Sequence, residues 1–364
     1  MSASRLLAER LVNQRLRGST IQKPADIVSW FGAMQSQDFA GARWALGQRM
    51  TNATDAEVAR AFDNGEILRT HVMRPTWHFV APADIRWLLA LTVPRVHACN
   101  APYYRRNELD AQTLSRARRV VEGALEGGIF LTRTELAAEL ARARIIADGE
   151  RLAYVMMHAE LDAVICSGPR KGRQFTYALL DERAPRAKML PHDEALATLT
   201  RRYFLSHAPA TIRDFAWWSG LTMAMAKNGV DLLGRGAASE DFNGIRYWRI
   251  RDNPRGDGSC RGVLLLPNYD EFLIAYRDRE LSLGQARLTD IGTRGRDTYV
   301  HHLLIDGRLA GSWRPELTRG RLNVAISTYQ RTTPTTTRAI ARVRQRYEAF
   351  VLSARPAPPS RGLV

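Results

Sequence analysis

The chain has 364 residues, of which 45% are hydrophobic and 25% charged, a composition typical of globular rather than disordered proteins. No apolar run approaches the roughly 18 residues that span a bilayer, and Met1–Arg10 resembles no signal peptide, so we expect a cytoplasmic protein without membrane association. The net charge of +16 favours a polyanionic partner, because positive potential attracts phosphates. Alternatively, the 49 arginines against four lysines reflect coding bias alone.

The cysteines and histidines indicate neither a disulfide framework nor a metal site. Cys99, Cys166 and Cys260 are odd in number, far apart, and form no CxxC pair. His301 and His302 are adjacent, a spacing that cannot place both on one face of a helix or strand. The motifs GxGxxG, GxxxxGK[ST], HExxH and GxSxG are absent. We therefore expect no metal and no cofactor.

Three segments share a helix-start pattern followed by a short apolar helix: Pro24–Met34, Thr132–Leu140 and Thr211–Leu221. The first opens with proline, which suits the first helical turn. The second and third open with Thr-x-x-acid, in which the hydroxyl and the carboxylate satisfy backbone N–H groups at the helix start. The chain therefore contains an internal repeat.

The sequence after each helix start also repeats in kind. After the second come a helix at Gly149–Leu161 and two apolar runs, Ala163–Cys166 and Gln174–Leu180, around the basic turn Gly168–Arg173. Helix, helix and hairpin make a winged helix, in which one helix enters a DNA groove. The first and third repeats continue with weaker forms of this pattern, at Asp55–Asn64, Leu68–Met73 and Trp77–Ala81, and at Ala224–Leu233 and Gly244–Ile250.

The last third of the chain is richer in strands, expected at Gly262–Leu266, Tyr299–Ile305 and Leu309–Trp313, before a helix at Arg338–Leu352. Asp306–Gly307 is a strong hairpin signal. We thus expect an α+β, predominantly helical fold of tandem winged helices. Its units span residues 1–125, 126–190 and 191–352, the last including a β-rich C-terminal portion, and residues 353–364 form a disordered tail.

Gln35 and Gln37 are the first candidates for chemistry. Two amides spaced i, i+2 in a non-helical segment point the same way and can hold one water molecule between them. An amide is no general base, but orientation of water suffices when the leaving group is already activated, as in a cationic N-alkylated purine. The alternative is that both glutamines cap helix ends or contact DNA phosphates.

A second polar group lies between residues 69 and 80. The strand-turn-strand pattern there carries Arg69, His71, Arg74, Thr76 and His78. Alternation places the last three on one face. They form either a polar wall that holds the sugar-phosphate of a target nucleotide or a half-buried strand with two structural histidines.

A third group is the acidic and basic stretch Leu266–Arg279, which includes Asp270, Glu271 and Arg277. Its charged residues can pair among themselves, and we regard the stretch as mainly structural. Asp270 is the member that can face a cleft, and Asp270 and Arg277 are kept as possible supporting residues.

The chain resembles a known protein family over about residues 5–350, and the matching stretches follow one another in the same order. The resemblance rests on QSQ at Gln35–Gln37 and on the stretches DFAGARWALGQR, THVMRPTWHFV, SGPRKGRQFTYALL, PATIRDFAWWSGL, LPNYDEFLIAYRDR and IDGRLAGSWR. Together they resemble the bacterial winged-helix proteins of the AlkZ type, which are alkylpurine and interstrand-crosslink DNA glycosylases. The paired glutamines are more similar to the crosslink-unhooking branch, whereas Ser36 stands where this family more often has an aliphatic or small residue.

The resemblance implies a monofunctional DNA glycosylase that acts on N-alkylated purines in double-stranded DNA, with interstrand crosslinks as further candidate substrates. It implies tandem winged helices around a DNA-binding channel, with Gln35 and Gln37 as the catalytic residues. We expect the protein to be a monomer associated with the nucleoid. The residues expected to contact DNA are Arg43, Arg69, Arg74, His78, Arg170, Lys171 and Arg173, with His71, Thr76, Asp270 and Arg277 in support.

Two other functions stay open from the residues alone. A non-catalytic winged-helix regulator would bind a defined DNA sequence and release no base, whereas a glycosylase binds largely without regard to sequence. An RNA-binding protein is disfavoured, because the stacked aromatic signature of the common RNA modules is missing.

Overall fold

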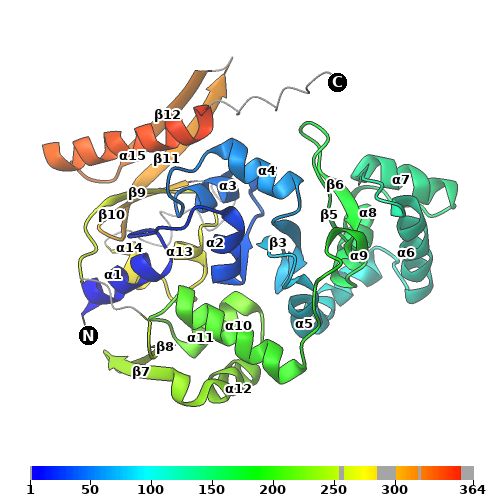
Figure 1. The fold of residues 1–364 in the computed structure, drawn as a ribbon, viewed down its shortest axis with the longest axis horizontal. Coiled ribbons are helices and arrows are strands. Elements are labelled where there is room, and N and C mark those ends of the chain that lie inside the picture. Colours follow the sequence, from blue (N-terminus) through cyan, green and yellow to red (C-terminus); the bar gives the residue numbers. More distant parts are fainter. Residues whose placement is uncertain (1, 254–257, 285–300, 319–320, 354–364) are drawn as a thin grey trace, which may run out of the picture.

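The computed structural model describes residues 2–253, 258–284, 301–318 and 321–353. Helices and antiparallel sheets alternate along these segments, which agrees with the expected α+β class (Figure 1). No helix in these four segments combines the length and apolar character needed to cross a bilayer. The expected tail, apart from Ser353, and the first two residues of the strand expected at Tyr299–Ile305 lie outside the described residues.

The N-terminal part contains a small sheet in the order β1-β3-β2, surrounded by four helices. Its elements are α1 (Ala3–Asn13), α2 (Pro24–Phe31), β1 (Ala33–Gln35), α3 (Phe39–Gly47), α4 (Asp55–Asp63), β2 (Leu68–Val72) and β3 (Arg74–Val80). The first predicted helix is therefore shorter than expected. Gly32 takes a φ of 84° and ends α2, and Ala33–Gln35 then pair with β3. Gln35 consequently lies at the end of a strand.

Two long helices follow, α5 (Ile85–Arg106) and α6 (Ala111–Leu125). Helix α5 continues through Pro94 and Pro102, although proline removes an intrahelical hydrogen bond. Burial of Leu88, Leu91 and Val96 stabilises the helix on both sides of Pro94, an instance of tertiary packing overriding a local preference.

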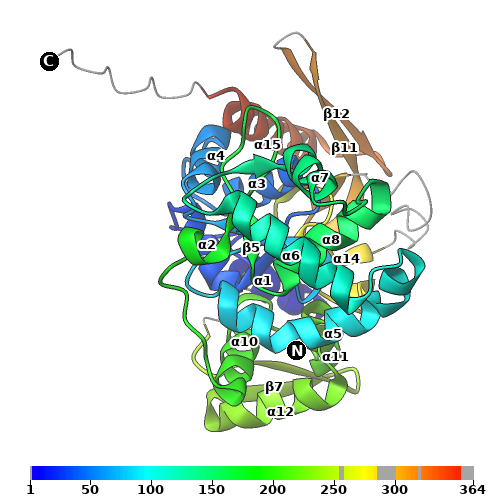
Figure 2. The ribbon, with the colours of Figure 1, turned by 90° about the vertical axis from the view of Figure 1, so that its right-hand side faces the viewer.

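The middle of the chain folds around its own apolar cluster. Figure 2 shows the ribbon of this part facing the viewer. This part comprises β4 (Leu131–Thr132), α7 (Arg133–Arg142), α8 (Gly149–Leu161), β5 (Ile165–Ser167), β6 (Thr176–Leu179) and the short α9 (Leu180–Arg183), with a sheet in the order β4-β6-β5. The predicted capping box is present: Thr132 accepts from the Glu135 N–H, and Glu135 accepts from the Thr132 N–H. The predicted helix at Gly149–Leu161 is confirmed with the same bounds.

The next elements are α10 (His192–Ser206), α11 (Ile212–Ser219), α12 (Met223–Leu233), a 3-10 turn at Gly234–Gly236, and the hairpin β7 (Ala237–Phe242)–β8 (Ile245–Ile250). The capping box of Thr211 and Asp214 is confirmed at the start of α11. Helix α10 was not predicted. It packs on α2, α5 and α12. Residues of the N-terminal sheet and α5 therefore share one apolar core with residues of α10, α11 and α12.

The C-terminal part of the chain packs against the N-terminal helices. It consists of β9 (Val263–Leu266), α13 (Glu271–Ile274), α14 (Glu280–Leu283), β10 (His301–Ile305), β11 (Arg308–Thr318), β12 (Arg321–Thr328) and α15 (Pro334–Leu352). Asp306 and Gly307 take φ values of 52° and 74°, and they form the predicted hairpin turn between β10 and β11. Helix α15 lies beside α3 and α4, so the two ends of the chain meet over a common core (Figure 1).

Candidate active site

The segment with the two glutamines begins in β1, the edge strand of the N-terminal sheet, and continues past its end. Gln35 ends β1 opposite His78 of β3, and Gln37 lies two residues beyond. Ser36 between them is 0% exposed, whereas Gln35 is half-buried and Gln37 is exposed. This alternation follows the period of an extended strand, although the Gln35 Oε1 atom is itself buried.

Hydrogen bonds to α13, β3 and β2 hold the backbone of Gln35 and Ser36, and a further one to β3 holds the Gln37 side chain. The Gln35 N–H donates to Glu271 Oε1 at 2.7 Å, and the Ser36 N–H donates to the Trp77 carbonyl at 2.8 Å. The Arg69 guanidinium donates to the Ser36 carbonyl at 3.2 and 3.1 Å. The Trp77 N–H donates to Gln37 Oε1 at 3.3 Å. The loop is therefore rigidly placed before any ligand binds, as a catalytic constellation requires.

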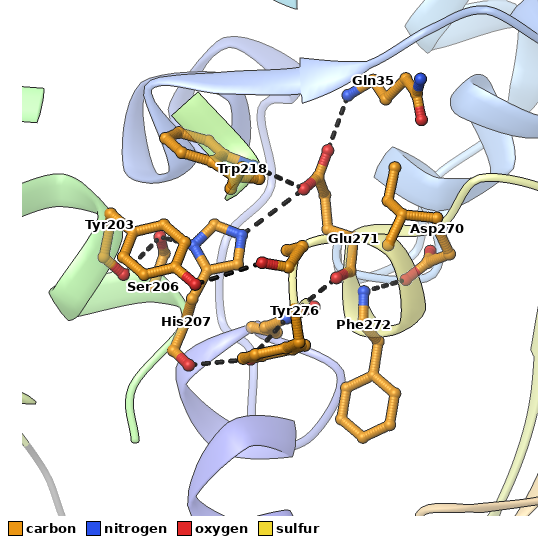
Figure 3. Close-up of polar contacts among 12 residues, drawn as sticks. Gln35, Tyr203, Ser206, His207, Trp218, Asp270, Glu271, Phe272 and Tyr276 are labelled. Atoms are coloured by element: carbon orange, nitrogen blue, oxygen red, sulfur yellow. Dashed lines mark hydrogen bonds and ion pairs between the residues drawn. The ribbon is translucent and has the colours of Figure 1, made fainter. Parts of the chain in front are cut away.

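Glu271 is the main site residue that the sequence did not single out. Its carboxylate is 1% exposed and accepts from the Gln35 N–H and, at 2.9 Å, from Trp218 Nε1, with His207 Nε2 at 3.5 Å (Figure 3). Burial alone would raise the pKa of Glu271, but its contacts with His207 and Gln35 outweigh that effect and lower it. A charged carboxylate is therefore hydrogen-bonded to the backbone N–H of Gln35.

Asp270, kept as a possible supporting residue, does not face a cleft. Its carboxylate forms a fully buried bidentate pair with Arg49, at 2.7 and 2.8 Å, and accepts from the Phe272 N–H at the start of α13. This pair fastens α13 to α3. Because Glu271 is the next residue, the pair also fixes where the Glu271 carboxylate points.

Several buried polar atoms lack a hydrogen-bond partner among the described residues and lie on the strands of the N-terminal sheet, where Gln35 is opposite His78 and His78 is opposite Thr70. They belong to the predicted polar wall and its neighbours: Gln35 Oε1, Thr70 Oγ1, Arg74 Nε and Nη2, Thr76 Oγ1 and His78 Nε2. Buried polar groups are normally paired, so such a cluster indicates a place that receives a polar ligand or water. It offers both donors, on Arg74, and acceptors.

His78 acts as an acceptor within this cluster. Burial is the main cause that lowers its pKa to about 3, and the charge of Arg74 lowers it further, so the imidazole is neutral. Its Nδ1 lies 2.9 Å from the Thr76 carbonyl, which requires the proton to be on Nδ1. Nε2 therefore carries a lone pair.

Gln37 faces a separate cavity of about 460 Å³ between the N-terminal sheet and the middle of the chain. Arg69 lies in its wall with its guanidinium 4.2 Å from the Trp77 ring centre, and Arg173 and Gln174 of the β5–β6 turn form another side. Burial lowers the pKa of Arg69 to about 10, so this guanidinium stays charged at neutral pH. The cavity unites residues that the sequence assigned to two different repeats.

Comparison with known proteins shows the family and the fold of the chain. Residues 28–350 match the model of a family described as AlkZ-like DNA glycosylases. The chain belongs to this family. An interstrand DNA cross-link repair glycosylase of Streptomyces sahachiroi is 23% identical over 321 residues, covering 85% of this chain and 86% of that protein. The fold is also that of the solved structure of Streptomyces sahachiroi DNA glycosylase AlkZ, with a TM-score of 0.78, 22% identity and 98% of each chain covered.

The buried environment of Ser36 would also suit the aliphatic or small residue that the resemblance led us to expect at this position. Its hydroxyl is buried and has no hydrogen-bond partner among the described residues. The main chain of Ser36, held by Arg69 and Trp77, determines the shape of the loop. The unusual side chain therefore leaves that shape intact.

Three of the predicted DNA contacts of this AlkZ-like chain already have acidic partners. Arg43 pairs with Asp55 at 2.7 Å, Arg170 with Asp63 at 2.8 Å, and Lys171 with Glu135 at 3.1 Å. His71 contacts Glu160 within the core. Arg277 lies in the wall of a different cavity, of about 1180 Å³, beside α11 and β8. Of the predicted cations, the structure brings Arg69 and Arg74 to the glutamine loop and Arg173 to the cavity beside it.

Proposed function

We propose that this AlkZ-like protein is a metal-independent DNA glycosylase that hydrolyses the N-glycosidic bond of N-alkylated purines in duplex DNA. The observation that carries the proposal is the clamped Gln35–Gln37 segment beside a cluster of unpaired polar atoms. The name of the Streptomyces relative supports extending the substrates to interstrand crosslinks. A crosslinked base cannot be flipped into an enclosed pocket, so such a substrate needs an open channel.

In this proposal Gln35 and Gln37 position water at the anomeric carbon of the damaged nucleotide. The free Gln35 Oε1 accepts a hydrogen bond from that water, and the Gln37 amide supplies the second contact. Alkylation makes the purine a good leaving group, so orientation of the nucleophile is sufficient. DNA phosphates and nearby dipoles stabilise the oxocarbenium-like sugar. Arg74 and His78 hold the damaged strand, while Glu271 and Arg69 act through the loop as positioning residues.

We further propose that the helix–helix–hairpin units, at residues 1–125, 126–190 and 191–352, are winged helices around a DNA-binding channel, and that the protein acts as a monomer at the nucleoid. The element order β4–α7–α8–β5–β6 supports a winged helix in the middle unit. A protein with this architecture can instead be a non-catalytic regulator, and the same experiment decides between the two functions.

The decisive experiment incubates the protein with duplex DNA containing N7-alkylguanine, in EDTA, and assays released base and strand integrity. We expect free base and an intact abasic strand, with no adduct trapped by borohydride. Strand cleavage through a Schiff base needs an amine at the lesion. Lys23 precedes α2, whereas Gln35 comes after it, and the eight residues of α2 span about 12 Å. We therefore do not expect Lys23 to act as that amine.

Absence of base release, together with tight binding to one DNA sequence, would identify a regulator. A trapped adduct that disappears in Lys23→Ala would make Lys23 the nucleophile. Activity lost in EDTA and restored by a metal ion, at a temperature where the metal-free protein stays folded, would contradict the metal-independent step.

The β5–β6 turn gives a test of where DNA binds. Replacing Arg170, Lys171 and Arg173 together is expected to weaken binding to all sequences alike. Arg170 and Lys171 are neutralised by Asp63 and Glu135, so Arg173 should account for most of the change in salt dependence. Arg173→Gln alone should lower the slope of log K against log salt by about 0.9, the value for one phosphate contact. Fluorescence anisotropy at several salt concentrations measures this slope, and an unchanged slope would place the DNA elsewhere.

A further inference from the structure

Two histidines and an aspartate meet where α5 packs against the end of α8. His97 belongs to α5, His158 to the last turn of α8, and Asp162 is the residue that follows that helix. His97 Nε2 lies 3.2 Å from Asp162 Oδ1, and His158 Nδ1 lies 3.2 Å from Asp162 Oδ2. One ligand atom from each of the three residues lies within 4.8 Å of the others.

The two histidine–aspartate distances are those of neighbouring ligand atoms around one divalent metal ion, and the three ligand atoms, which lie within 4.8 Å of one another, need only move slightly closer to share it. With metal–ligand bonds of about 2.1 Å, two atoms 3.2 Å apart subtend an angle of about 100° at the metal, between the octahedral and the tetrahedral values. Two imidazole nitrogens and a carboxylate are a frequent donor set for zinc, with water in the fourth position. All three side chains are at least partly accessible to solvent, so an ion has a path to them.

A neighbouring hydroxyl orients one of the ligands. Tyr104 Oη lies 2.9 Å from His97 Nδ1, on the side of the ring away from Asp162, and Asn100 donates to the same hydroxyl at 3.4 Å. When His97 Nδ1–H donates to Tyr104, the lone pair of Nε2 points to the shared centre. Metal-bound histidines usually have such a partner at their second nitrogen.

We propose that His97, His158 and Asp162 form a structural binding site for a divalent transition-metal ion such as Zn²⁺. The ion joins α5, which follows the N-terminal sheet, to α8, the central helix of the middle part of the chain. It therefore stiffens the junction between the two. None of the three residues contacts Gln35 or Gln37 in the described structure, so the site is independent of the proposed catalytic step.

The sequence pointed away from a metal site because the adjacent His301 and His302 cannot share a face. The useful signal was His158-x-x-x-Asp162, which places two ligands on one side of a helix end. The third ligand lies 61 residues earlier, at His97, and only the packing of α5 on α8 brings it there.

The test is calorimetric titration of the full-length, untagged and metal-free protein with ZnCl₂. We expect about one strong site per chain. His97→Ala and Asp162→Asn should each weaken zinc binding by at least about 100-fold, and Tyr104→Phe, which removes only the orienting hydroxyl, by about 10-fold. Zinc should also raise the Tm of the parent protein but not that of the ligand variants. His192→Ala is the matched control, because His192 forms an exposed histidine–aspartate pair elsewhere.

Substitution of Co²⁺ for zinc provides a second readout, since d–d absorption reports nitrogen and oxygen coordination directly. Should His97→Ala fail to fold, Asp162→Asn, which alters an exposed residue with little change in volume, decides the question. Zinc binding that persists in Asp162→Asn, or that is lost equally in His192→Ala, would overturn the proposed site. So would the absence of a stoichiometric site in the parent protein.

Discussion

Alanine at both Gln35 and Gln37 is expected to reduce base release by about 10²–10³-fold, the range measured when a single positioned polar group is removed from other enzymes. DNA affinity should change little, because the held water contributes in the transition state more than in the bound state. Single-turnover assays on N7-alkylguanine duplexes, beside anisotropy on the same DNA, measure the two quantities separately.

The matched control for this variant is Gln112→Ala, which removes an exposed glutamine from α6. It should excise at the parental rate. Gln37→Ala alone should preserve stability, since the side chain is exposed and its amide accepts only the Trp77 N–H. A double variant that released base as fast as the parent would remove the catalytic assignment and leave the glutamines as structural or DNA-contacting residues.

Replacing Glu271 by glutamine is expected to lower both the stability of the fold and the rate of base release. An amide presents one oxygen where the carboxylate presents two, so either the Gln35 N–H or Trp218 Nε1 faces an NH₂ group. An unsatisfied buried donor costs about 1–3 kcal/mol, and the loss of charge beside His207 adds to this. We expect the free energy of unfolding to fall by about 2–4 kcal/mol, as measured by denaturant titration.

The effect of Glu271→Gln on catalysis should exceed that of an equally destabilising change. With the Gln35 N–H no longer held, the loop loses its fixed geometry, and kcat should fall at least about tenfold with little change in KM. Trp218→Phe is the control, because it removes a donor to Glu271 Oε2 and buried volume but leaves the contact from Oε1 to Gln35. If both variants, assayed well below their Tm values, lost activity to the same extent, Glu271 would be a core residue only.

Local sequence determined most of the individual elements. The capping boxes at Thr132 and Thr211 fixed the starts of α7 and α11, and Asp306–Gly307 fixed the turn between β10 and β11. These signals depend on residues three or fewer positions apart, so they can be recognised without a fold. Local signals do not account for the part of α5 beyond Pro94 or for α10, because there tertiary packing outweighs local preference.

The candidate site likewise combines features that the sequence determines with features that depend on the fold. The amino-acid sequence by itself determined the two glutamines, their i, i+2 spacing and the polar side chains of β3. Only the tertiary structure decided what holds them. Glu271 lies 236 residues from Gln35, and a carboxylate in a stretch of alternating charges looks like a surface residue until the fold buries it. The same folding paired Arg170 and Asp270 with partners 107 and 221 residues away. Long-range ion pairs depend on how separate elements pack, which neither periodicity nor composition encodes.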